Sequence, residues 1–91
     1  MLSEIGEKLI DALRGRVDEH TYIGLMLDLN GAGLPREERE KYDSDKSFKK
    51  MLDYLITNPK ANQSDIMRQH RVIMGLPSYE EVLPNKKYAL T

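Results

Sequence analysis

The residues of this chain that could carry chemistry are few and far apart. The sequence contains no cysteine, which removes a thiol nucleophile, a disulfide framework and every thiolate metal site. Its two histidines, His20 and His70, are separated by fifty positions, and no His-x-x-x-His pair is present to hold a zinc ion. The side chains that most often act as nucleophiles and metal ligands therefore do not form a recognisable set.

The surroundings of each histidine point to a structural role. Asp18, Glu19 and His20 are consecutive, and consecutive side chains on a helix point in different directions. This triplet therefore does not predict a shared site. His70 falls on the apolar side of its expected helix, where a partly buried, hydrogen-bonded histidine is the common outcome.

Other motifs of catalysis are missing from the sequence. It has no Gly-x-Ser-x-Gly, no Gly-x-Gly-x-x-Gly and no phosphate-binding loop ending in Gly-Lys-Ser/Thr. Glu37, Glu38 and Glu40 form an acidic cluster, but it lacks the spacing and central glycine of a calcium loop, which favours a solvated helix face. We expect a protein that is not an enzyme, with no catalytic residue, no metal site and no cofactor.

One stretch suggests contact with nucleic acid. In "YLITNPKANQSDIMRQH" (54–70) a helix, a polar linker and a second helix beginning at Ser64 follow the order of a helix-turn-helix reader. Lys60, Arg68 and Arg71 could then lie along a phosphate backbone. The segment that should enter the groove is short and carries Glu80 and Glu81, which phosphates would repel. DNA binding by the basic region 44–83 is the alternative hypothesis.

The charge of the chain is unevenly distributed. Residues 1–43 hold six Lys or Arg against ten Asp or Glu, a balance of −4, and residues 44–91 hold eight against five, a balance of +3. The basic half could meet an acidic partner or its own acidic half. Because there is no overall basic excess, nucleic acid is the less favoured partner.

The sequence shows no sign of targeting to a membrane. The N-terminal stretch "MLSEIGEKLIDALRGR" is acidic before it is basic, unlike a signal peptide. The longest run nearly free of charge, "TYIGLML" (21–27), is far shorter than the ~20 residues that span a bilayer. We expect a cytoplasmic protein with no membrane partner.

The segments that must position these residues have the apolar periodicity of helices. Apolar residues recur on one face over 4–17, 45–57 and 64–74, with Ser3, then Asp43 or Ser44, then Ser64 as expected N-caps. Asn58-Pro59 should end the second of these helices. The fold class expected is all-α, a compact single-domain bundle of four or five short helices over residues 1–84, with a C-terminal tail at 85–91.

The segment 18–31 has two interpretations. As a strand it alternates apolar residues and ends in an Asn30-Gly31 turn, but no partner strand follows, which favours a helix. As a helix it is apolar nearly all round, so part of it should remain outside the core. The candidate protein interface consists of Tyr22, Ile23, Met26 and Leu27.

Gly-Leu-Pro occurs at 33–35 and again at 75–77, each time after an apolar run. A glycine ends a helix well because it adopts positive φ, and proline suits the start of the next helix. Gly31 or Gly33, and then Gly75, should therefore end one helix, with Glu37, Glu38 and a Ser78–Glu81 capping box opening the next. Both copies are interpreted as corners between helices.

The sequence thus predicts a small helical protein that acts through protein–protein contacts, as a regulator, inhibitor or assembly component. The partner is not identified, and a homodimer is one candidate. The expected core consists of Leu9, Leu13, Leu25, Leu29, Phe48, Leu52, Leu55, Ile66 and Ile73.

Overall fold

A computed structural model describes residues 2–77 of the chain. These residues fold into five helices of a single all-α domain, as the sequence predicts. Within them no helix is both long enough and apolar enough to cross a membrane. The helices are α1 (Glu4–Leu13), α2 (Glu19–Leu29), α3 (Arg36–Lys41), α4 (Ser44–Thr57) and α5 (Gln63–Met74).

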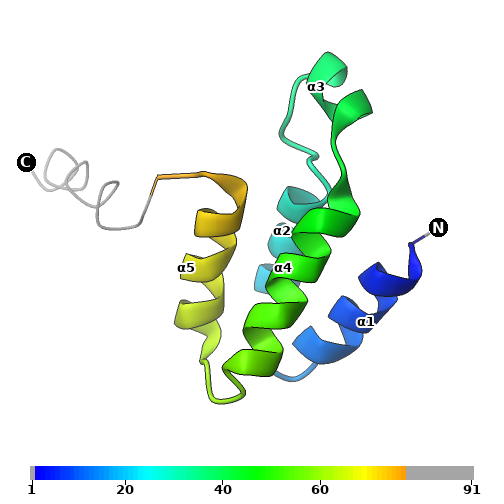
Figure 1. Ribbon diagram of the computed structural model, residues 1–91. Helices are drawn as coiled ribbons and strands as arrows, with labels where there is room; N and C mark the ends of the chain where they lie inside the picture. The colour runs from blue at the N-terminus through cyan, green and yellow to red at the C-terminus, as the bar shows by residue number, and fades with distance from the viewer. Residues whose placement is uncertain (1, 78–91) are drawn as a thin grey trace, which may run out of the picture.

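The chain turns back on itself twice, from α1 into α2 and from α4 into α5, and we call these two segments the hairpins, although α1 packs mainly on α4. Figure 1 shows α1 and α4 running in one direction and α2 and α5 running in the other. The Ser3 hydroxyl donates to Asp45 (2.6 Å) at the start of α1 and α4, which confirms that these two helices are parallel. Helix α4 is central, because it packs against α1, α2 and α5.

Local signals account for most helix ends. Ser3 caps α1 and Asp43 caps α4, each accepting a hydrogen bond from a backbone N–H of the first turn. Asn58 ends α4, and Gly75 ends α5 in the left-handed conformation (φ 67°). The ambiguous segment is the helix α2, which confirms the favoured interpretation.

Two expected boundaries are wrong. Helix α1 ends at Leu13 and not near Val17, because Gly15 takes positive φ (80°) and turns the chain. Helix α5 begins at Gln63 and is capped by Asn62, so Ser64 is not its N-cap. The Asn62 side chain accepts from the Asp65 N–H and the Asp65 carboxylate accepts from the Asn62 N–H, so the two residues form a reciprocal capping box that satisfies two backbone groups.

The two Gly-Leu-Pro corners end parallel helices and so lie together. Gly31 is the residue with positive φ after α2 (78°), and Pro35 is the cap of α3. Leu34 and Leu76 line one cleft of about 130 Å³. The capping box expected at Ser78–Glu81, and the boundary between domain and tail, lie outside the described residues.

The core differs from the expected one at its edges. Leu52 and Ile73 are only partly buried, whereas Met26 and Met51 are in the core. The apolar stripe of α4 spans a wide arc, and the other helices cover its Met51 side, so that Ile56 at the opposite edge is 69% exposed. The core is formed by Leu9, Leu13, Leu25, Met26, Leu29, Phe48, Met51, Leu55 and Ile66.

The turns of the two hairpins are joined by hydrogen bonds. The Arg16 guanidinium donates to the carbonyl oxygens of Leu55 (3.3 Å), Asn58 (2.9 Å) and Ala61 (3.2 Å). A cation at the C-terminal end of α4 also suits the helix dipole. Arg16 therefore holds the α1–α2 turn against the end of α4.

A second link joins the N-terminal ends of α2 and α5. The Asp18 N–H donates to Gln63 Oε1 (2.7 Å), and Gln63 Nε2 donates back to the Asp18 carboxylate (2.9 Å). The backbone N–H of Thr21, followed by the Gln63 amide, lowers the pKa of Asp18 below its ordinary value. The stabilisation linked to this carboxylate is present above about pH 4. It is lost as the pH falls through the lowered pKa.

Changing Arg16 to alanine should destabilise the domain by about 1–3 kcal/mol, because three carbonyl oxygens lose a charged donor. Denaturant unfolding followed by circular dichroism measures this loss. Arg16→Lys should recover part of it, since lysine reaches one carbonyl at a time. Equal stability of wild type and Arg16→Ala would show that the two turns do not depend on this link.

Candidate functional site

Two residues of the predicted interface, Ile23 and Leu27, are exposed on the outer face of α2. Ile23 is 48% exposed and Leu27 is 53% exposed, one helical turn apart. From Thr21 to Leu27 the helix has no charged side chain, which is unusual for a face in contact with water. We call Ile23 and Leu27 the α2 ridge.

A cleft opens beside this ridge, between α1 and α2. Its volume is about 300 Å³, and its apolar lining comes from Ile10, Leu13, Val17 and Tyr22. Glu19 also lines the cleft and lies one helical turn before Ile23, so the α2 ridge begins at the edge of the cleft. We call this space the α1–α2 cleft. The sequence did not predict it, because the cleft combines residues of α1, the α1–α2 turn and α2, and α1 packs mainly on α4.

The four residues of the predicted interface therefore separate. Ile23 and Leu27 lie on the surface, and Tyr22 is half-buried at the cleft. Met26 is only 8% exposed, because it shares the inner side of α2 with Leu25 and Leu29. Met26 is a core residue, and it must be removed from the candidate interface.

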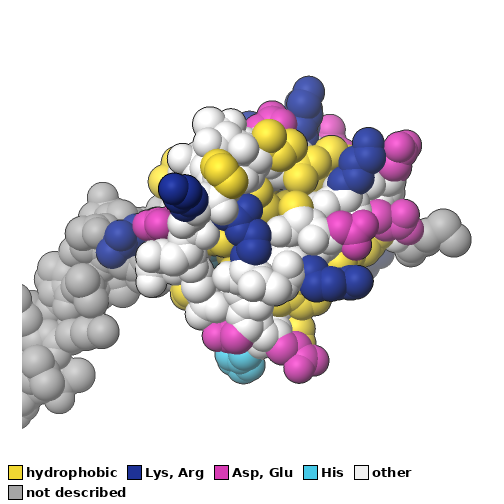
Figure 2. Space-filling model, turned by 90° about the horizontal axis from the view of Figure 1, so that it is seen from below, with side chains coloured by type: hydrophobic (Ala, Val, Ile, Leu, Met, Phe, Trp, Pro, Cys, Tyr) yellow, Lys and Arg dark blue, Asp and Glu magenta, His cyan; other side chains and the backbone are white. Residues whose placement is uncertain are grey.

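The three residues of the nucleic-acid hypothesis lie on or near α5. Lys60 is exposed in the α4–α5 turn, and Arg68 is exposed on α5. Arg71 is half-buried, and its Nε donates to the Pro77 carbonyl oxygen (2.6 Å). Figure 2 views the end of the molecule that carries the two hairpin turns. Basic and acidic side chains are intermixed there.

The arrangement of α4 and α5 differs from that of a helix-turn-helix reader. In such a motif the two helices cross at a steep angle, so that the second can enter the major groove. Here α4 and α5 lie side by side and run in opposite directions (Figure 1). The segment that the DNA hypothesis expects to enter the groove, which carries Glu80 and Glu81, lies outside the described residues.

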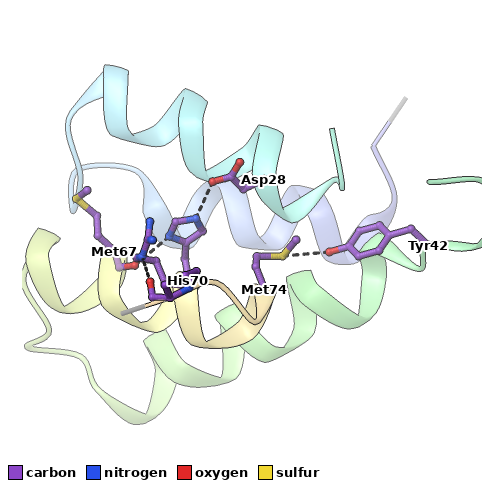
Figure 3. Close-up of polar contacts among 7 residues, drawn as sticks. Asp28, Tyr42, Met67, His70 and Met74 are labelled. Carbon is purple, nitrogen blue, oxygen red and sulfur yellow. Dashed lines mark hydrogen bonds and ion pairs between the residues drawn. The ribbon is translucent and has the colours of Figure 1, made fainter. Parts of the chain in front are cut away.

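His70 is the buried polar residue of α5, as the sequence predicts, and it bridges α5 to α2. It is 6% exposed. Its Nδ1 lies 2.9 Å from the Met67 carbonyl oxygen and its Nε2 lies 2.8 Å from the Asp28 carboxylate (Figure 3). A carbonyl oxygen only accepts, so Nδ1 carries a proton. Nε2 donates to an ionised Asp28 when it carries a proton too. Both nitrogens are thus engaged in holding the two helices together.

The fold also brings His20 towards this pair. His20, Asp28 and His70 line one cleft of about 300 Å³ between α2 and α5, although the histidines are fifty positions apart in sequence. The described residues contain no group of three or more His, Asp or Glu side chains placed to hold a metal ion. The contact between Asp28 and His70 joins residues forty-two positions apart, and no local sequence pattern predicts it.

The acidic cluster lies on α3, where every side chain is exposed. Glu37 and Glu38 occupy the first turn, where a helix favours negative charge. Glu40 forms an ion pair with Arg36 (3.6 Å). This is the solvated helix face that the sequence predicts.

Replacing Asp28 with alanine should destabilise the domain by about 1–3 kcal/mol, because a buried donor of His70 loses its partner. Asp28→Asn should lose less, since the amide can donate to a neutral Nε2 while Nδ1 keeps its bond to Met67. Thermal unfolding of the two variants compares them directly. If the alanine variant is as stable as wild type, the bridge does not support the fold.

The α1–α2 cleft and the α2 ridge thus form an apolar surface with a concave and a convex part. Comparison of the chain with protein-family models, with curated proteins and with solved structures found no match.

Proposed function

We propose that this chain is a small non-enzymatic binding protein that acts through contacts with another protein, as a regulator, inhibitor or assembly component. The observation that carries the proposal is the α2 ridge. Ile23 and Leu27 are each about half exposed, and no described residue covers them. These two side chains and the apolar lining of the adjacent α1–α2 cleft form a contiguous apolar patch, the kind of surface that interfaces use.

The energetics are compatible with a specific contact. Full burial of a leucine or isoleucine side chain contributes about 1.5–3 kcal/mol. Because about half of each ridge side chain is still exposed, a partner that covers both gains about 2 kcal/mol from them. Side chains that fill the adjacent α1–α2 cleft add to this gain.

The state of the histidines supports a non-enzymatic role. The His70 ring is 6% exposed and both of its nitrogens face oxygen atoms of the protein, an arrangement that joins α5 to α2. His20 is exposed at the first turn of α2. It lies beside the α2 ridge, where it can form part of a polar rim.

Site-specific photo-crosslinking in cells that produce the protein tests the proposal. A photoreactive phenylalanine analogue in place of Leu27 should give a discrete adduct with a protein. The same analogue in place of Lys49, which is exposed on α4, should not. Adding Ile23→Asp to the Leu27 probe should abolish the adduct. Failure to form any adduct at position 27, or equal adducts at both positions, would refute the proposal.

The alternative hypothesis, DNA binding by residues 44–83, is tested by titration with random duplex DNA at low salt. We expect no binding, because the described basic residues are mixed with acidic ones and the segment expected to enter the groove carries Glu80 and Glu81. A tight complex that weakens steeply with salt would favour the alternative. In that case Lys60→Ala and Arg68→Ala should each reduce the salt dependence.

A further inference from the structure

The α2 ridge and the α1–α2 cleft lie next to each other on one face of the domain. The ridge is convex and apolar, formed by Ile23 and Leu27. The cleft is concave and its inner lining is also apolar, with Ile10, Val17 and Tyr22 half-buried around it. A surface that carries an apolar ridge beside an apolar hollow can pair with its own copy after a rotation of 180°, because each ridge then faces a hollow.

We infer that the protein that covers this face is a second copy of the chain, in a two-fold symmetric dimer. This inference rests on the proposed function. In such a dimer the α2 ridge of each protomer enters the α1–α2 cleft of its partner, and the same contact is made twice. The dimer therefore buries two α2 ridges and two α1–α2 clefts, one of each from each protomer.

The charges around the cleft permit this pairing. Arg14 and Glu19 both line the cleft, and both are exposed. Within residues 2–77 neither of them forms an ion pair. Their charges are opposite, so the charged residues that line the cleft carry no net charge. Two-fold rotation can place Arg14 of each protomer near Glu19 of its partner, which gives two reciprocal ion pairs at the rim.

Other exposed apolar residues of the described surface do not pair a ridge with a neighbouring cleft in the same way. Ile56 and Val72 are each 69% exposed, but Ile56 is on α4 and Val72 is on α5, with charged side chains beside them. Val72 lines the α4–α5 groove together with Lys50 and Asp53. These two residues therefore serve as controls of similar exposure.

Sedimentation equilibrium at tens of micromolar protein should give about twice the chain mass of 10.5 kDa. Ile23→Asp and Leu27→Asp should each give the mass of one chain while circular dichroism shows an unchanged helical fold. Ile56→Asp and Val72→Asp should remain dimeric. A wild-type protein with the mass of one chain at every concentration overturns the dimer. The crosslinking experiment then decides separately whether a different protein binds the ridge.

A charge exchange tests the symmetric pairing itself. Arg14→Glu alone and Glu19→Arg alone should each raise the dimer dissociation constant several-fold, because each places like charges at both reciprocal contacts. The double variant should restore dissociation to near the wild-type value. If the double variant dissociates as readily as the worse single variant, the two-fold arrangement is overturned.

Discussion

Replacing Phe48 with alanine is expected to remove a large part of the stability of this domain. Phe48 is 1% exposed and is the largest fully buried side chain of the core. It packs across the α1–α4 contact, where its ring lies so close to Gly6 that a Cβ added there would be 3.2 Å from Cε2. Removal of a buried phenylalanine ring costs about 3–5 kcal/mol, from lost burial and from the cavity that remains. A small domain has only about 5–15 kcal/mol in total.

The adjacent residue provides the control. Lys49 is exposed on the opposite side of α4, and Lys49→Ala should change stability by less than about 0.5 kcal/mol. Denaturant unfolding of wild type and both variants measures the two free energies. Small and equal losses for Phe48→Ala and Lys49→Ala would mean that α1 does not pack on α4 in solution.

The second large effect is expected at Gly31, where two penalties act together. Its φ of 78° lies in the left-handed region, and a Cβ there would come within 2.7 Å of the Tyr42 ring. Strain of this kind costs about 1–3 kcal/mol before the overlap is counted. Gly31→Ala should therefore lower the free energy of unfolding by at least that amount, and denaturant unfolding measures it.

Two other glycines separate the penalties. Gly15 also has positive φ (80°) but nothing within 4 Å of an added Cβ, so Gly15→Ala should show the conformational penalty alone. Gly24 lies within α2 with open space around it, so Gly24→Ala should stabilise by up to about 1 kcal/mol. A Gly31→Ala variant no less stable than Gly15→Ala would show that Tyr42 does not pack over Gly31.

The fold was largely predictable because its signals are local. A stripe of apolar residues every three or four positions requires a helix to bring it to one side, and caps such as Ser3, Asp43 and Gly75 act within one turn. The predictions of burial were wrong where the exposure of a side chain depends on helices that are distant in sequence. Leu52 and Ile56 follow the stripe of α4 as well as Leu55 does, but only the positions of the neighbouring helices determine which of them is covered.

The candidate site was predictable in part for the same reason. An excess of apolar residues in α2 indicated an exposed ridge, and Ile23 and Leu27 form it. The periodicity did not place Met26 inside, because α2 is apolar on nearly every side. The α1–α2 cleft, the Arg16 link and the His70–Asp28 bridge all join residues from separate helices or turns, and no pattern within one segment reveals them.

Methyl-detected NMR over a dilution series tests most directly the claim that the α2 ridge and its cleft form the interface. Four exposed aliphatic residues report on three helices, Ile23 and Leu27 on α2, Ile56 on α4 and Val72 on α5. We predict that dilution from tens of micromolar shifts the methyl signals of Ile23 and Leu27 and leaves those of Ile56 and Val72 in place. Shifts confined to Ile56 and Val72, or signals that do not move at any concentration, would contradict a dimer formed through this face.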